Sequence, residues 1–248
     1  MRLNPFKAAT NVSSIFKSIL SFNTILNEKP VDPHLLQNLF KMDEALEGTP
    51  HGERSTKFQL QNANMRKLYE ENWQPERLDL NKLKKLPSGS LGKVYADNLI
   101  RQGFTPDELL DLDPHPINSE REFLCHRQWQ VHDLAHTILG FNTSVEGEIG
   151  VQAFMFAQTQ APTHLFIFFG VLFRFCGLGL ISEGMEFEGL LLSIARGFTL
   201  ASQTKIMINS FKFEEQMDRP INEIREELGL PTKENITLKF IEPLFYGF

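Results

Sequence analysis

The 248-residue chain has few cysteines and few polar aromatic residues, and its charge is weighted toward acids. Its two cysteines, Cys125 and Cys176, are too few for a disulfide framework, so we expect a reducing compartment. Acidic residues outnumber basic ones by 31 to 25, and the net charge of −6 gives no electrostatic indication of nucleic-acid binding, so none is expected. Against three tyrosines and two tryptophans stand 22 phenylalanines, so the aromatic content is strongly apolar.

A long uninterrupted apolar run is also lacking. The most apolar segment, 165–181, contains Arg174 and three glycines, whereas a membrane-spanning helix needs about 20 apolar residues. A charge inside a span costs roughly 2.5 kcal/mol or more on insertion scales. We therefore expect 165–181 to be a buried core helix or one wall of an apolar pocket. An intermediate interpretation is a Phe-rich face that meets a membrane surface or a lipid tail.

Residues 1–27 contain basic residues and serines but no acid, which is typical of an organellar transit peptide. The same segment carries apolar residues at helical spacing, which predicts an amphipathic N-terminal helix over 8–27. Of the two interpretations we favour the ordinary helix. No continuous apolar run follows the first basic residues, so a secretory signal is not predicted.

Apolar residues recur at helical spacing along the chain, and no meander of strands is evident. Besides 8–27, helices are expected over 33–46, over 59–72, and from the 88–93 loop to about 103. A long helix is expected from 118 or 119 to 140, and after a turn at 140–143 another runs to about 160. The remaining expected helices are 162–179, 182 to about 210, and 221–228. Residues 48–52 are expected to form a loop. The chain is thus predicted to be all-α, a single-domain helical bundle over 1–248 with a core of about 35–230 and a C-terminal tail at 231–248.

The Gly/Ser-rich loop 88–93 precedes one of these helices. Backbone N–H groups at a helix N-terminus, together with Ser90 and Lys93, can bind an anion or a polar head group. The spacing is not that of a P-loop. Ordinary helix capping by the serine is the favoured interpretation.

Two histidines and a carboxylate lie close together in the long helix that is expected to end at 140. His132 and His136 are four residues apart, so they lie about 40° apart on one helix face. Their neighbours on that face include Trp129, which indicates that the face points inward. Asp133 lies about 60° from His136, within side-chain reach of a shared metal. Two histidines at this spacing can chelate one ion.

The following helix contributes Glu148. If the chain turns at 140–143, His136 and Glu148 lie at the same level of an antiparallel helix pair. Thr143 and Glu146 predict a capping box at the start of the second helix. The capping box would occupy Glu146, which leaves Glu148 as the predicted ligand.

A metal site between the two antiparallel helices would consist of His132, Asp133, His136 and Glu148. Gln152, one turn beyond Glu148, and His126 are expected to support these ligands. Two imidazoles and two carboxylates suit zinc, iron, manganese or cobalt, and suit magnesium less well because it prefers oxygen ligands. The alternative is a set of hydrogen-bonded polar core residues, but the convergence of four such residues favours a metal.

The series His132-Asp133-x-x-His136, eleven residues and Glu148 resembles the hallmark of the coenzyme Q (ubiquinone) biosynthesis protein 4 family. The segment 86–95, Leu-Pro-Ser-Gly-Ser-Leu-Gly-Lys-Val-Tyr, is similar to a second signature of that family. Phe213-Glu214 and Ile224 to Gly229 are similar to its C-terminal end. The chain departs from the family pattern in having Lys93 for the usual arginine and Phe213 for the usual tryptophan, which leaves the metal motif intact.

The resemblance implies a helical, membrane-associated protein that binds a divalent metal, with zinc favoured, and a long isoprenoid lipid. It implies a role in replacing the C1 carboxyl of a polyprenylated benzoate by hydroxyl, with other quinone-biosynthesis proteins as partners. The implied location is the cytoplasm, peripheral to the membrane, in a bacterium, or the matrix side of the mitochondrial inner membrane in a eukaryote. Lipid-exposed phenylalanines suit a homodimer or a membrane face. The lipid tail would lie in an apolar groove lined by Phe154, Met155, Phe166, Phe169, Phe173, Leu190 and Leu192.

Three functions remain open on these residues. The first is a metal-dependent decarboxylase/hydroxylase of a prenylated aromatic compound. The second is a non-catalytic isoprenoid-binding scaffold or carrier that organises quinone-biosynthesis enzymes. The third is a prenyl-phosphate hydrolase, because the adjacent His132 and Asp133 are also similar to HD phosphohydrolases, although the partner spacings of that superfamily are not evident.

Overall fold

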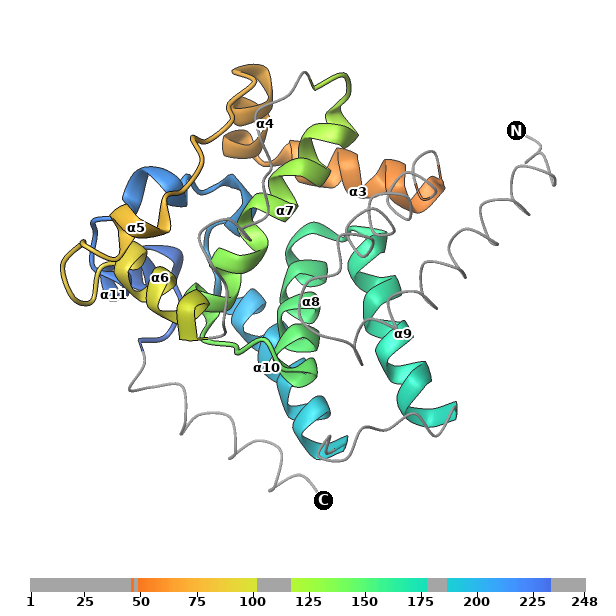
Figure 1. Ribbon diagram of the computed structural model, residues 1–248. Helices are drawn as coiled ribbons and strands as arrows, with labels where there is room; N and C mark the ends of the chain where they lie inside the picture. The colour runs from red at the N-terminus through yellow and green to blue at the C-terminus, as the bar shows by residue number, and fades with distance from the viewer. Residues whose placement is uncertain (1–45, 47–48, 102–116, 178–186, 233–248) are drawn as a thin grey trace. The chain divides into compact units, whose positions relative to one another are not determined.

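The computed structural model describes residues 46, 49–101, 117–177 and 187–232, and within these ranges regular structure is helical (Figure 1). The only strand-like feature there is an isolated bridge between Ser90 and Pro220. The all-α prediction is therefore confirmed. The expected helix over 8–27, nearly all of 33–46 and most of the tail at 231–248 lie outside the described residues. The assignment of one domain to 1–248 stays a prediction.

The helices fall into two compact units, 1–60 with 144–198 and 61–143 with 199–248. In the first, α8 (Val145–Thr159) and α9 (Pro162–Gly177) lie side by side (Figure 1). α10 (Phe187–Gln203) belongs to this unit up to Phe198. Ile149, Val171 and Leu190, one from each of the three helices, form a buried apolar cluster. Burial of such side chains removes apolar surface from water and stabilises the unit.

α3 (Pro50–Gln61) begins where a loop was expected. The prediction was wrong because Thr49 caps the helix by accepting a hydrogen bond at Oγ1 from the Gly52 N–H at 3.1 Å. Pro50 then occupies the first helical position, where its missing N–H costs nothing. The expected helix over 59–72 is also wrong, since the chain breaks at Asn62, whose side chain caps α4 (Ala63–Glu70).

The second unit contains α5 (Leu80–Leu83), α6 (Leu91–Arg101), α7 (Glu120–Leu139), α11 (Ile221–Leu228) and two short 3-10 helices, η1 (Ile208–Ser210) and η2 (Phe213–Gln216). Backbone hydrogen bonds join the start of α6 to the segment before α11. The N–H of Leu91 donates to Arg219 O at 2.8 Å, and that of Ile221 donates to Gly89 O at 3.0 Å. The signature at 86–95 therefore lies next to the segment 217–221 at the start of α11.

α10 ends at Gln203, earlier than the expected end near 210, and its expected start at 182 lies outside the described residues. The Thr204 hydroxyl donates to Leu200 O at 2.7 Å, and the Lys205 N–H donates to Leu228 O at 2.8 Å. These contacts direct the chain onto α11. α11 ends as predicted at Gly229, which adopts φ 80°.

α9 coincides with most of the apolar segment 165–181. Ile167 and Val171 are buried, whereas Phe169 is 56% exposed. The helix therefore has a core-facing side and an apolar exposed side. Among the described helices, none combines the length and apolarity needed to cross a membrane.

Candidate metal centre

α7 carries both histidines of the metal motif and has the predicted bounds. Ser119 caps its start by accepting from the Glu122 N–H, and Gly140 ends it in the left-handed conformation at φ 72°. Glycine adopts this conformation without the strain that a Cβ would cause. His132 and His136 lie one turn apart in the second half of the helix.

α8 carries the carboxylate of the motif. Its cap is Ser144, which accepts from the Gly147 N–H at 3.3 Å, so the predicted capping box of Thr143 and Glu146 is wrong by one residue. The third helical position after Ser144 is a glycine, which has no side chain to close such a box. Glu148 lies in the first turn of α8, as expected.

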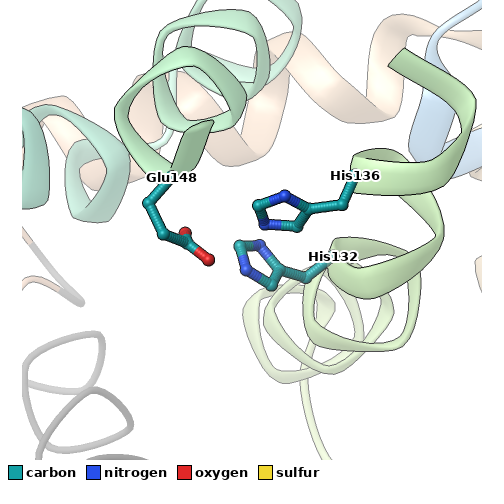
Figure 2. Close-up of side chains that lie close together, drawn as sticks. All are labelled: His132, His136 and Glu148. Atoms are coloured by element: carbon teal, nitrogen blue, oxygen red, sulfur yellow. The ribbon is translucent and has the colours of Figure 1, made fainter. Parts of the chain in front are cut away.

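The structure brings His132, His136 and Glu148 together (Figure 2). Each residue offers one ligand atom, and these atoms all lie within 4.8 Å of one another. The two imidazole rings lie edge to face, with centroids 5.0 Å apart, and the Glu148 carboxylate points toward them (Figure 2). Two imidazoles and a carboxylate at this separation form a donor set that suits zinc or a similar divalent metal.

A hydrogen bond at His136 is also consistent with a metal-binding role for this residue. Its Nδ1 lies 2.9 Å from the carbonyl oxygen of Asn142. A carbonyl only accepts, so Nδ1 carries the proton, and in the neutral ring Nε2 then presents a lone pair. Histidine ligands of metals typically have their other ring nitrogen fixed in this way. The residues present therefore fit a bound divalent metal.

Asp133, predicted as a fourth ligand, is not part of the three-residue group. Its carboxylate lies close enough to Tyr95 on α6 to affect the ionisation of that phenol. Burial raises the pKa of Tyr95 well above its usual value, and the charges of Asp133 and Glu214 raise it further. The role of Asp133 as a ligand stays a prediction.

The two predicted supporting residues are both buried. His126 Nδ1 lies 3.2 Å from the Gln130 side-chain amide. Gln152 Oε1 lies 2.6 Å from Nδ1 of His164 on α9. His164 was not selected from the sequence, because a single histidine in a Phe-rich helix carries no spacing signal. The Gln152–His164 hydrogen bond joins α8 to α9 one turn beyond Glu148.

Ser90 acts as the cap of α6, as the favoured interpretation predicted, by accepting from the Lys93 N–H at 3.3 Å. The N–H groups of Leu91 and Gly92 donate to backbone carbonyls of the segment 217–219. Lys93 forms an ion pair with Asp97 at 2.8 Å. These groups are thus engaged within the protein, and a head-group role for Ser90 and Lys93 stays a prediction.

The residues predicted to line a lipid groove differ in exposure. Phe154, Met155 and Leu190 are fully buried, Phe166 is half-buried, and Phe169 and Leu192 are exposed. The side chain of Phe173 lies outside the described part of the chain. Phe169 belongs to an exposed apolar set on α9 and α10, here called the apolar face, which comprises Phe169, Leu191, Leu192 and Phe198.

Two buried arginines contact α7 and were not selected as functional from the sequence. Arg127, on α7 itself, pairs with Glu214 at 2.6 Å and donates to the carbonyls of Asn209 and Phe211. Arg225 of α11 donates to the carbonyls of Thr137 and Ile138 at the end of α7. Glu214 and Arg225 lie in the segments that are similar to the C-terminal end of the family, and this similarity was the sequence signal that could have identified them.

Comparison with known proteins agrees with these motifs. Residues 64–234 match the family described as Coenzyme Q (ubiquinone) biosynthesis protein Coq4. The mitochondrial ubiquinone biosynthesis protein COQ4 of Uncinocarpus reesii is 34% identical over 156 residues, which cover 62% of this chain and 52% of the relative. Its counterpart in Aspergillus fumigatus is 35% identical over 156 residues, with coverage of 62% and 51%. The chain thus spans about half the length of the fungal relatives that it matches.

A solved structure has a similar fold. It is the crystal structure of a Nostoc punctiforme protein that is provisionally described as a ubiquinone biosynthesis protein. The TM-score is 0.71 at 27% sequence identity, and the similarity covers 90% of this chain and 99% of that chain.

Proposed function

Because this chain belongs to the coenzyme Q (ubiquinone) biosynthesis protein Coq4 family, we propose that it is a metal- and polyisoprenoid-binding protein of ubiquinone-type quinone biosynthesis. The observation that carries the proposal is the group His132, His136 and Glu148, whose ligand atoms lie within 4.8 Å of one another. The lone pair that His136 presents at Nε2 supports the same assignment. These three residues would hold the metal.

The proposed ligand is a lipid with a polar aromatic head and a long apolar tail. A divalent metal bound at these residues supplies a Lewis acid for an oxygen of the head group. The apolar face, with its exposed Phe169, Leu191, Leu192 and Phe198, supports contact with an isoprenoid tail or with a membrane surface. The names of the fungal relatives place those proteins in mitochondria, which supports the mitochondrion as the compartment of this chain.

The proposed reaction is exchange of the C1 carboxyl of a polyprenylated benzoate for hydroxyl. This exchange releases CO₂ and needs an oxidant. Zinc does not activate O₂, whereas iron held by two histidines and a carboxylate does so in known oxygenases. The metal present in the purified protein therefore bears directly on the catalytic role.

The proposal is tested in cells that lack their own member of the family. Glu148→Gln keeps the size of the side chain but removes the charge on the metal ligand. We expect this variant to lose both bound metal and quinone synthesis. Glu146→Gln, which changes a neighbouring carboxylate outside the group, is expected to retain both. Full metal content and normal quinone levels in Glu148→Gln would refute the proposal.

A non-catalytic scaffold or carrier is the second candidate function, and the exposed apolar face favours it. The two functions differ in a reaction with purified protein and a prenylated hydroxybenzoate labelled with ¹⁴C at the carboxyl. A catalyst releases labelled CO₂ in the presence of O₂, and Glu148→Gln abolishes the release. A scaffold binds the lipid and releases no label.

A further inference from the structure

The last turn of α7 depends on groups outside that helix. The final four carbonyls of an α-helix have no partner within it. In α7, the carbonyl of His136 accepts from the N–H groups of Gly140 and Phe141, both at 3.0 Å. The carbonyls of Thr137 and Ile138 accept instead from Arg225 of α11, from Nη2 at 3.1 Å and from Nε at 2.9 Å. A side chain from α11 thus completes the turn that carries His136.

Arg225 suits this position by charge and by shape. It is 5% exposed, and its positive charge lies at the negative end of the α7 dipole, where cations are stabilising. The planar guanidinium donates to two successive carbonyls at once, which a lysine ammonium does not reproduce. Arg225 is itself held at the end of α11, where Leu230 N–H donates to its carbonyl at 2.8 Å.

The contact is next to a predicted metal ligand. Thr137 and Ile138 are the two residues that directly follow His136, and the His136 ring donates to the Asn142 carbonyl beyond the end of the helix. Hydrogen bonds therefore hold both the backbone carbonyls and the imidazole of the turn from His136 to Asn142. If the carbonyls of Thr137 and Ile138 shift, the imidazole of His136 shifts with them.

We propose that Arg225 is a positioning residue for the metal centre: it holds the last turn of α7 so that His136 presents Nε2 to the metal. This inference rests on the proposed metal-binding function. It gives part of the C-terminal signature, Ile224 to Gly229, a role at the metal site, although that segment supplies no ligand in the three-residue group.

The test measures Co²⁺ affinity and the visible d–d spectrum of bound Co²⁺ in the full chain. The variants are Arg225→Ala, Arg225→Lys and the control Leu228→Ala, which opens a cavity in α11 but keeps the arginine. All are measured at a temperature at which circular dichroism shows them folded. We expect Arg225→Ala to weaken Co²⁺ binding by about tenfold and to alter the spectrum, as loss of groups that orient metal ligands typically does. Arg225→Lys is expected to lie between this variant and the wild type.

Leu228→Ala is expected to lose stability while retaining the affinity and spectrum of the wild type. The inference is overturned if folded Arg225→Ala matches the wild type, or if Leu228→Ala weakens binding as much as Arg225→Ala. If Arg225→Ala does not fold, Arg225→Lys decides by the same two readouts. A wild-type protein that binds no Co²⁺ would refute the proposed function itself, and this inference with it.

Discussion

His136 donates from Nδ1 to the Asn142 carbonyl, and this single contact makes Nε2 available to a metal. The four-residue spacing of His132 and His136 predicted a shared face, and Glu148 was predicted from its level on the next helix. The structure brings these three together. The contact with Asn142 could not be predicted, because it depends on the path of the chain after Gly140 rather than on residue types.

The buried pair of Arg127 and Glu214 provides the first test at this scale. Its side chains are 1% and 7% exposed, so removal of the Glu214 charge leaves the buried Arg127 guanidinium without this carboxylate partner. We expect Glu214→Gln to lower the free energy of unfolding by about 3 kcal/mol or more. Urea unfolding measures the change. Glu215→Gln, at a neighbouring carboxylate that is 53% exposed, should change stability by less than about 0.5 kcal/mol. Equal effects of the two substitutions would contradict this account.

Tyr95 makes stability depend on alkaline pH. Its raised pKa, caused first by burial and then by Asp133 and Glu214, keeps the phenol protonated in the folded protein after the unfolded chain has ionised. The stability from this difference is fully present below about pH 10 and is lost as pH rises toward the folded pKa. Above pH 10, we expect the stability of metal-free wild type to fall more steeply than that of Tyr95→Phe, by a difference that approaches about 1.4 kcal/mol per pH unit as the unfolded phenol ionises. Urea unfolding between pH 8 and 11 measures both slopes, and parallel slopes would show that Tyr95 titrates normally.

At the scale of elements, predicted helix ends agree with the structure where a single strong signal marks them. Gly140 and Gly229, two left-handed glycines, end their helices where expected, and Ser119, one of the two predicted caps, begins α7. The wrong bounds occur where a side-chain cap was not recognised. Ser144 rather than Thr143 caps α8, and Asn62 interrupts a periodic apolar pattern that continues across it. The spacing of apolar residues is the same for one long helix and for two successive helices, whereas a capping side chain marks where the second helix begins.

The crossing of α8 and α10 requires a glycine. A Cβ at Gly197 would lie 3.0 Å from the Cβ of Ala153, 3.1 Å from the backbone N of Phe154, and closer still to the Gly150 carbonyl. We therefore expect Gly197→Ala to lower the free energy of unfolding by about 1–3 kcal/mol.

Gly189→Ala, on the same helix, is the matched control. Its Cβ would lie 3.7 Å from Glu146 Cγ, which is ordinary contact. Because alanine favours a helix over glycine by up to about 1 kcal/mol, this variant should be neutral or more stable. Thermal unfolding measures both, and a Gly197→Ala protein as stable as the control would refute the close approach.

At the scale of the whole molecule, the fold class and the family could be predicted from the sequence. Helical periodicity runs through the chain, and the metal motif with its two flanking signatures is specific. The structure adds that the segment 86–95 is hydrogen-bonded through its backbone to 217–221, and that Arg225 of the C-terminal signature donates to carbonyls of α7. Such contacts join residues far apart in sequence and leave no local pattern from which to predict them.

The apolar face gives a test of lipid contact. The rings of Phe169 and Phe198 each contact the ring of the half-buried Phe168 edge to face, so aromatic contacts run from α9 to α10. We expect Phe169→Ser with Leu191→Ser to weaken binding to vesicles of phosphatidylcholine and cardiolipin by at least tenfold, because apolar area is lost from the contact. Ile100→Ser, at an exposed apolar residue outside this face, is the control. Vesicle co-sedimentation measures all three proteins, and unchanged binding of the double variant would exclude the apolar face.

The central claim is that His132, His136 and Glu148 hold a divalent metal in a protein that also binds an isoprenoid lipid. Native mass spectrometry of the protein purified without chelators tests it most directly. The account predicts a species that carries one divalent metal ion and one isoprenoid lipid, and loss of the metal in Glu148→Gln. A wild-type protein with neither metal nor isoprenoid would contradict the account.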